Sequence, residues 1–205
     1  MDKKVIIFDF DGTIADTFPV FVEFARSESF DFSPEETEEL RNLSMRDVIA
    51  KLKLPAWKVP FLASKFHGYF QKASPKVQLF GGIADVIREL RESGYVMAIV
   101  TSNSRSNVEH LLNRDGIRDC FDIIHSERSL FGKAKPLGKI MRRLQVEPKT
   151  VWYVGDEVRD VEAARGAGMR SLAVMWGFNS KEALRSANPD RIAASPNELP
   201  DLLLR

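Results

Sequence analysis

Short apolar runs recur along the chain, and each is followed by a polar or glycine-containing segment. The runs cover residues 5–8, 95–101, 151–156 and 170–177, with shorter ones near Ile123 and Ile192. Continuous runs of this kind are typical of parallel strands that are buried on both faces. The segments between them carry apolar residues at helical spacing, and two of these segments end at Gly94 and Gly168, as helices often do. Strands that alternate with helices predict an α/β fold with a doubly wound, Rossmann-like parallel sheet.

Residues 17–75 interrupt this alternation, because they contain no strand-like run. Ser33 precedes a proline and two glutamates, and Ser44 stands three residues before an aspartate, so both predict helix starts. A longer helix begins near residue 55, and we expect Pro60 to kink or break it. Phenylalanines recur at helical spacing, which predicts a small helical bundle with an aromatic core. We therefore predict a helical domain of residues 17–75, inserted into an α/β core of residues 1–16 and 76–205.

Composition limits the partners that the chain is expected to have. The 30 Lys and Arg residues nearly balance the 29 Asp and Glu residues, so neither nucleic acid nor an anionic membrane is indicated. No apolar run approaches the length of a membrane span. Cys120 is the single cysteine, which excludes an internal disulfide and favours a buried structural thiol. The chain enters an apolar strand at once, without a signal peptide, and we expect a cytoplasmic protein.

Two carboxylates, Asp9 and Asp11, follow the first apolar run, and Gly12 comes next. In open α/β sheets, ligands bind in the crevice at the carboxyl ends of the strands. Strand alternation would turn both carboxylates to the same side, with Phe10 pointing away. Two like charges that lie so close need a cation, or one of them must keep its proton.

Polar residues also follow two of the other predicted strands. Thr101, Ser102 and Asn103 offer a hydroxyl and backbone N–H groups before a helix, which suits an anion, although a plain helix N-cap is the alternative. Asp156 and Asp160 are four residues apart at the start of another helix, and Asp156 by itself would suit an N-cap. If these acids converge with the first acidic pair, they indicate a hard cation with oxygen ligands, Mg²⁺ before Ca²⁺.

These motifs in this order resemble the haloacid dehalogenase superfamily of phosphohydrolases, and the resemblance extends over nearly the whole chain. The sequence DFDGT, a Thr/Ser pair, Lys-Pro and GDxxxD stand at the expected places. The resemblance implies Asp9 as the nucleophile that becomes an aspartyl phosphate and Asp11 as the acid/base. It also implies Mg²⁺ held by Asp9, Asp11, Asp156 and Asp160, and phosphate contacts from Gly12, Thr101, Ser102, Asn103 and Lys135. Glu157 departs from the pattern, because many relatives carry a small hydroxylic residue there.

A catalytic lysine also belongs to this constellation, and the sequence offers two candidates for it. Lys133 and Lys135 are two residues apart, and the residues themselves do not choose between them. The superfamily places its lysine before a proline, which selects Lys135. A positive charge there would neutralise the phosphoryl oxygens and keep the nucleophile ionised.

The predicted helical insert stands where the superfamily carries its type 1 cap, which closes over the site. A cap of this size implies a small phosphorylated metabolite as the partner, and the C-terminal run resembles the phosphoglycolate phosphatase branch. Arg41 and Arg46 are candidates to meet a second anionic group of the substrate, with solvated surface arginines as the alternative. The three histidines have no metal-ligand spacing, so packing or surface roles are expected for them.

The sequence thus predicts a Mg²⁺-dependent phosphatase that acts through an aspartyl phosphate. A phosphomutase acting on a sugar phosphate is the main alternative. A receiver-like signalling domain fits less well, because its phosphorylated aspartate would follow a strand in mid-chain. A catalytically silent binding module is disfavoured, because every required side chain is present.

Overall fold

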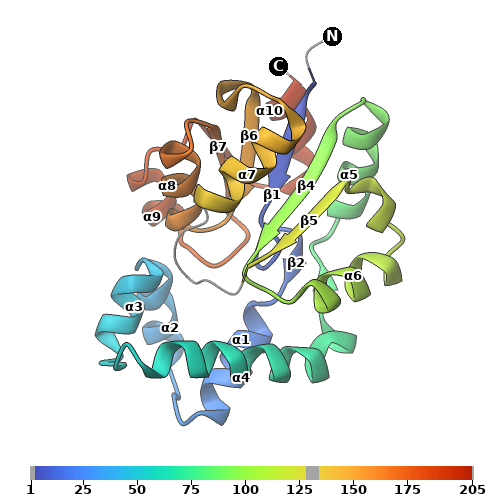
Figure 1. Cartoon of the computed structure of the whole chain (residues 1–205). Coiled ribbons are helices and arrows are strands. Elements are labelled where there is room, and N and C mark those ends of the chain that lie inside the picture. Colours follow the sequence, from blue (N-terminus) through green and yellow to red (C-terminus); the bar gives the residue numbers. More distant parts are fainter. Residues whose placement is uncertain (1–2, 128–133, 205) are drawn as a thin grey trace.

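The computed structural model of the chain describes residues 3–127 and 134–204. Six parallel strands form one sheet in the order β5-β4-β1-β6-β7-β8 (Figure 1). Their bounds are β1 Val5–Phe8, β4 Val96–Thr101, β5 Ile123–Ser126, β6 Val151–Gly155, β7 Arg170–Val174 and β8 Arg191–Ala193. In the centre, Ile7 of β1 pairs with Ala98 on one side and Tyr153 on the other. The predicted doubly wound α/β fold is confirmed.

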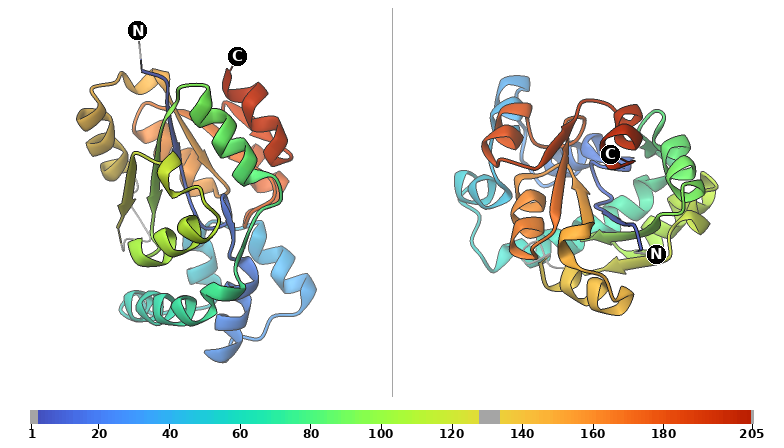
Figure 2. Two further views of the ribbon diagram at one scale, coloured as in Figure 1. Left: turned by 90° about the vertical axis from the view of Figure 1, so that its right-hand side faces the viewer. Right: turned by 90° about the horizontal axis from the view of Figure 1, so that it is seen from above.

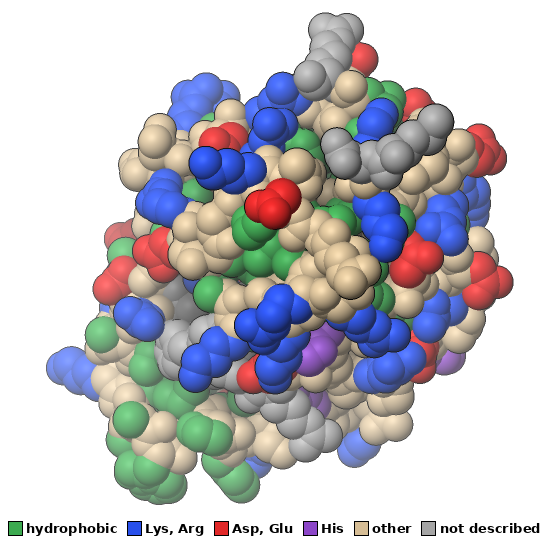
Figure 3. Space-filling model, turned by 45° about the horizontal axis from the view of Figure 1, so that its top comes forward, with side chains coloured by type: hydrophobic (Ala, Val, Ile, Leu, Met, Phe, Trp, Pro, Cys, Tyr) green, Lys and Arg blue, Asp and Glu red, His purple; other side chains and the backbone are tan. Residues whose placement is uncertain are grey.

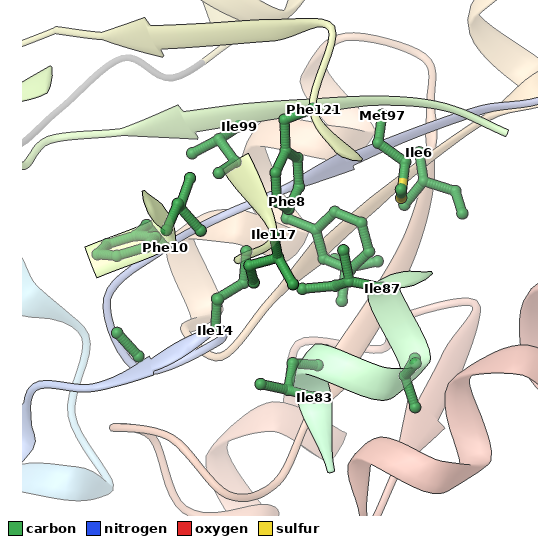
Figure 4. Close-up of a cluster of buried hydrophobic side chains, with 14 of the residues drawn as sticks. Ile6, Phe8, Phe10, Ile14, Ile83, Ile87, Met97, Ile99, Ile117 and Phe121 are labelled. Carbon is green, nitrogen blue, oxygen red and sulfur yellow. The ribbon is translucent and has the colours of Figure 1, made fainter. Parts of the chain in front are cut away.

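Helices cover both faces of the sheet, as the view from above shows (Figure 2). Ile6 and Phe8 point to the face that is covered by α5 (Ile83–Glu92), α6 (Arg105–Arg114) and α10 (Leu199–Leu204) (Figure 4). Val5 and Ile7 point to the opposite face, which is covered by α7 (Ala134–Leu144) and α8 (Val158–Gly166). Burial on both faces is the physical reason why β1 is apolar at every position. The other elements of this part are α9 (Lys181–Ser186), η2 (Arg118–Cys120), η3 (Pro148–Thr150) and η4 (Pro196–Glu198).

A two-stranded antiparallel ribbon connects the sheet to the inserted helices. It is formed by β2 (Ala15–Asp16) and β3 (Gln78–Leu79), which is preceded by η1 (Ser74–Lys76). Between the two strands lie α1 (Phe18–Ser27), α2 (Pro34–Arg41), α3 (Met45–Lys51) and α4 (Lys58–Ala73). These four helices lie beyond the carboxyl edge of the sheet (Figure 1), so they face the edge where the acidic residues were expected. We call them the helical insert.

The helix starts follow the sequence signals, with one correction. Ser33 and Glu36 form a capping box, in which the Ser33 Oγ accepts from the Glu36 N–H. The Ser44 Oγ accepts from the Asp47 N–H at the start of α3. The expectation that Pro60 kinks or breaks a helix is wrong, because α4 begins at Lys58 and Pro60 lies in its first turn. A proline is tolerated there, since the first N–H groups of a helix have no intrahelical acceptor.

Aromatic rings join α1 to α4, as the spacing of the phenylalanines predicts. The Phe66 ring lies 6.1 Å from that of Phe21 and 5.3 Å from that of Phe24, centroid to centroid. Basic and acidic side chains are interspersed on the face in Figure 3, and hydrophobic side chains gather at its lower left. Two exposed large hydrophobic residues of the insert are Trp57 and Phe61, at 72% and 60% exposure. No helix in the described ranges is long and apolar enough to cross a membrane.

Candidate active site

The chain makes a tight turn directly after β1, and this turn begins the candidate site. The Phe10 N–H donates to Asp9 Oδ1 at 2.8 Å, and the Ile14 N–H donates back to the Phe10 carbonyl at 2.9 Å. Gly12 has a φ of +74°, which glycine adopts at little cost. A Cβ at this position would lie 2.1 Å from Asp156 Oδ2. Gly12 therefore permits both the turn and the close approach of Asp156.

Three buried carboxylates meet at the carboxyl edge of the sheet. Asp9 follows β1, Asp156 follows β6, and Asp160 lies in the first turn of α8. One oxygen from each lies within 4.8 Å of the other two. Burial, followed by the nearby charges of Glu157, Asp160 and Asp9, raises the pKa of Asp156 well above its ordinary value. A cation would reverse this effect, and an all-carboxylate set of oxygens suits Mg²⁺. The three residues therefore fit the predicted metal site.

Hydrogen bonds fix the orientation of Asp156. Thr13 Oγ1 donates to Asp156 Oδ1 at 2.8 Å, and the Phe178 N–H donates to Asp156 Oδ2 at 2.7 Å. A Cβ on Gly177 would lie 2.2 Å from the Asp156 Cβ, so a larger residue would displace this side chain. The carboxylate is thus held between the turn after β1 and the segment after β7.

Hydrogen bonds from β6 and from the N-terminus of α8 orient the side chain of Asp160. The Glu157 N–H donates to Asp160 Oδ2 at 3.1 Å, and the Tyr153 hydroxyl donates to Asp160 Oδ1 at 3.3 Å. Burial and the charges of Asp160 and Asp9 raise the pKa of Tyr153 well above its ordinary value. The phenol therefore keeps its proton and remains a donor to the carboxylate.

The carboxylate of Asp11 lies outside this cluster. Asn103 Nδ2 donates to Asp11 Oδ1 at 2.9 Å, and Thr101 Oγ1 donates to Asp11 Oδ2 at 3.4 Å. The structure therefore does not bring the Asp11 side chain together with the other three acids, although the sequence predicted a set of four. The reason is that β1 ends at Phe8, so the two-residue alternation does not continue through the turn.

The residues that end β4 surround Asp11 instead. Thr101 and Asn103 are buried, and Thr101 Oγ1 accepts from the Asn103 N–H at 3.0 Å. The N-cap of α6 is Ser104, whose Oγ accepts from the Asn107 N–H. The N-cap alternative therefore applies to Ser104, and Thr101, Ser102 and Asn103 lie before the helix. Their predicted contacts with phosphate stay a prediction.

The three predicted basic residues lie on three different helices, α2, α3 and α7. Arg41 donates from Nε to the Phe178 carbonyl at 2.9 Å and from Nη2 to the Gly177 carbonyl at 3.1 Å. It thus attaches α2 to the core. Arg46 is exposed on α3, and Lys135 is exposed in the first turn of α7. Lys133, the other lysine considered, lies outside the described residues.

Several residues of the site carried no sequence signal that we used. Tyr153 belongs to an apolar strand and looks like a core residue until its hydroxyl is placed beside Asp160. Arg159 pairs with the buried Glu157. Burial by itself would lower the pKa of Arg159, but Glu157, Asp160 and Asp9 raise it above its ordinary value. The short spacing of Glu157 and Arg159 was the one available sign of this pair.

A cavity of about 210 Å³ extends from this site into the helical insert. The end at the core is lined by Asp11, Gly12, Ser102, Asn103, Asp156, Glu157, Arg159 and Phe178, and residues of the insert between Thr17 and His67 line the remainder. Asp11 and Asp156 therefore face a cavity that extends into the insert.

Comparisons with known proteins agree with this geometry. A family model described as haloacid dehalogenase-like hydrolase matches residues 6–174. The chain is 36% identical over 201 residues to a phosphoglycolate phosphatase of Synechococcus elongatus, covering 96% of this chain and 95% of that protein. It is 26% identical to an N-acetylmuramic acid 6-phosphate phosphatase of Pseudomonas aeruginosa, covering 100% of this chain and 96% of the relative.

Solved structures share the same arrangement. A haloacid dehalogenase-like family hydrolase from Streptococcus pneumoniae has a TM-score of 0.79 and 26% identity, and the match covers 98% of both chains. A predicted phosphatase from Clostridium acetobutylicum has a TM-score of 0.84 at 19% identity, covering 100% of this chain and 99% of that chain. The similarity thus includes the helical insert as well as the sheet.

Proposed function

The chain belongs to the haloacid dehalogenase-like hydrolases and is a phosphatase, and we propose that it hydrolyses a small phosphomonoester through a covalent phosphate on Asp9, with Mg²⁺ as cofactor. The observation that carries this proposal is the separation of the acids into two environments. Asp9 lies in the buried cluster with Asp156 and Asp160, whereas Asp11 is held by Thr101 and Asn103. Pairs of acids in different environments commonly divide the roles in catalysis.

Asp9, Asp156 and Asp160 would hold the metal ion. A bound Mg²⁺ would neutralise the clustered carboxylates and the charge of the phosphoryl oxygens. The carboxylate of Asp9 attacks phosphorus, and the bond from phosphorus to the alcohol oxygen breaks. Asp11 acts as the acid and gives its proton to that oxygen. Asp11 then takes a proton from a water that attacks phosphorus, which frees Asp9 and orthophosphate.

The relatives support a small phosphoester but not one particular alcohol. Proteins that are named after phosphoglycolate and after N-acetylmuramic acid 6-phosphate both match nearly the whole chain. The family therefore accommodates different leaving groups on one catalytic frame.

The test is phosphate release from a panel of phosphomonoesters, phosphoglycolate included, with Mg²⁺ and with chelator. We expect Mg²⁺-dependent release that falls at least about 10³-fold in Asp9→Asn, because the nucleophile is lost. Asp119→Asn is the matched control, since Asp119 is exposed and remote in sequence from the acidic residues. Equal release by wild type and Asp9→Asn would contradict the mechanism. Isomerised sugar phosphate without released phosphate would indicate the phosphomutase instead.

The same assay identifies the lysine that contacts the phosphate. We propose Lys135, with Lys133 as the alternative that the sequence leaves open. Replacing the correct lysine with alanine removes a charge that stabilises the transferring phosphoryl group, so we expect a loss of about 10²-fold or more. A loss in Lys133→Ala, with Lys135→Ala close to wild type, would move the assignment to Lys133.

A further inference from the structure

Within the helical insert the lining of the cavity is almost entirely apolar, whereas its end at the core carries Asp11, Ser102, Asn103, Asp156, Glu157 and Arg159. Six phenylalanines of the insert contribute to it: Phe18, Phe21, Phe24, Phe30, Phe32 and Phe66. Phe178 of the core adds a seventh ring, and Leu, Val and Ile side chains of α2 to α4 complete the wall. Most of these rings are half-buried, and Phe24 is the one that is fully buried. The rings of the insert therefore present apolar surface to the cavity.

Basic side chains are nearly absent from this wall. Among the described residues that line the cavity, the only Lys or Arg is Arg159, which pairs with Glu157. Arg41 is bonded to backbone carbonyls of the core, and Arg46 does not line the cavity. In the described part of the chain, the basic groups near this wall are Arg41 and Arg159, which already pair with Glu38 and Glu157. A carboxylate placed among the phenylalanines would lose its water and would have to share these charges, which is costly.

His67 is the polar residue of the insert that lines the cavity. Its Nε2 lies 2.8 Å from the Ser102 carbonyl oxygen, which can only accept, so Nε2 carries the hydrogen. Nδ1 is buried without a hydrogen-bond partner among the described residues, and a hydroxyl group of a ligand could supply that partner because it both donates and accepts.

We propose that the substrate is a phosphomonoester of an uncharged, largely apolar alcohol of about the size of a benzene ring, and that a second anionic group is disfavoured. This inference rests on the proposed phosphatase function, with phosphate at Asp9 and Asp11 and the alcohol portion in the cavity. An apolar cavity of about 150 Å³ is enough for benzene, and this one measures about 210 Å³. The substrate class thus differs from that in the names of the phosphoglycolate phosphatase relatives.

The first test is a series of n-alkyl phosphates from methyl to hexyl, because their alcohols leave with nearly equal chemical ease. We expect kcat/KM to rise about fourfold for each added methylene until the cavity is full. Phosphoglycolate should fall below ethyl phosphate, which has the same two carbons and no carboxylate. A flat series with phosphoglycolate as the best substrate would overturn the proposal.

A binding measurement distinguishes failure of the cavity inference from failure of the proposed phosphatase function. Methyl and hexyl phosphonate cannot be hydrolysed, so calorimetry with Mg²⁺ measures how much the alkyl chain adds to binding affinity even if no ester releases phosphate. Tighter binding of hexyl phosphonate supports the cavity inference in either case. Equal binding of the two phosphonates overturns it, whatever the activity.

Substitutions of residues that line the cavity test whether the cavity causes the preference for longer alkyl chains. Ala63 of α4 lines the cavity, and Ala63→Phe would fill it, whereas Ala50→Phe adds the same ring at an exposed position of α3. We expect the ratio of kcat/KM for hexyl over methyl phosphate to fall at least about tenfold in Ala63→Phe and to stay unchanged in Ala50→Phe. Leu54→Lys, in the turn before α4, keeps the proposal testable if Ala63→Phe misfolds. It should raise the preference for phosphoglycolate over ethyl phosphate, and an unchanged preference would count against the proposal.

Discussion

At the scale of single residues, glycine positions decide whether the acids can meet. Gly12 has a positive φ and faces Asp156, whereas Gly116 has a φ of +65° and open space around it. Both would be strained by a side chain, but only Gly12 has a catalytic group in the way. Gly177 shows the opposite combination, with no positive φ and a Cβ position 2.4 Å from the Gly12 carbonyl oxygen. Close approach and backbone strain are therefore separable in this site.

Replacing Gly12 and Gly116 with alanine should separate the effect of backbone strain from the effect of close approach to Asp156. We expect Gly116→Ala to lower the free energy of unfolding by about 1–2 kcal/mol, the cost of a left-handed side chain, with phosphate release unchanged. Gly12→Ala should show that cost and also lose Mg²⁺-dependent activity, because the methyl group displaces Asp156. Urea unfolding and the phosphate assay measure the two quantities. Activity in Gly12→Ala within about twofold of Gly116→Ala would refute the steric argument.

At the scale of elements, the segment after β7 connects the core to the helical insert. Asn179 is buried, and its Nδ2 donates at 2.9 Å to the carbonyls of both Arg41 and Leu43. Its Oδ1 accepts from the Val158 N–H at 2.8 Å, at the start of α8. One side chain thus joins the α2–α3 turn to the helix that carries Asp160.

Removing this side chain should loosen the insert locally. In Asn179→Ala, the Leu43 carbonyl and the Val158 N–H lose a partner, at about 1–3 kcal/mol for each group that stays buried, while the Arg41 carbonyl keeps the Ser180 N–H. We expect faster amide hydrogen exchange in residues 34–54 than in wild type, and a smaller change in α1. Asn113→Ala, at an exposed position of α6, is the matched control. Exchange in residues 34–54 that matches this control would show that Asn179 does not hold the insert.

At the scale of the whole molecule, the acidic cluster joins parts of the chain that are far apart in sequence. Asp9 comes from the first strand, and Asp156 and Asp160 come about 150 residues later, at β6 and α8. Without a cation, the burial of these carboxylates and their mutual repulsion oppose folding, and both raise the pKa of Asp156. The folded state therefore gains more from a divalent cation than the unfolded chain does.

Magnesium should accordingly stabilise the protein, and chelator should remove that effect. At about 100 times its Kd, a ligand of the folded state adds about 2.7 kcal/mol, or roughly 2–4 °C of Tm per kcal/mol at this size. The gain should shrink as pH falls, because protons compete with the metal for the carboxylate of Asp156, whose pKa is raised. Thermal unfolding with Mg²⁺ or chelator measures it. An equal Tm gain in Asp160→Asn would exclude Asp160 as a ligand.

The sequence by itself determined the α/β fold, the helical insert between the first two apolar runs, and the identity of the acidic residues. Those features depend on hydrophobic periodicity and on short motifs, which are local properties of the chain. Only the tertiary structure decided which acids meet. Asp11 turns to Thr101 and Asn103 because the strand ends before it, and Tyr153 serves Asp160 although it lies in an apolar strand. The anchoring of Arg41 to backbone carbonyls and the apolar cavity depend on how the insert packs against the core. No local pattern encodes such packing, because its partners are more than 130 residues apart in sequence.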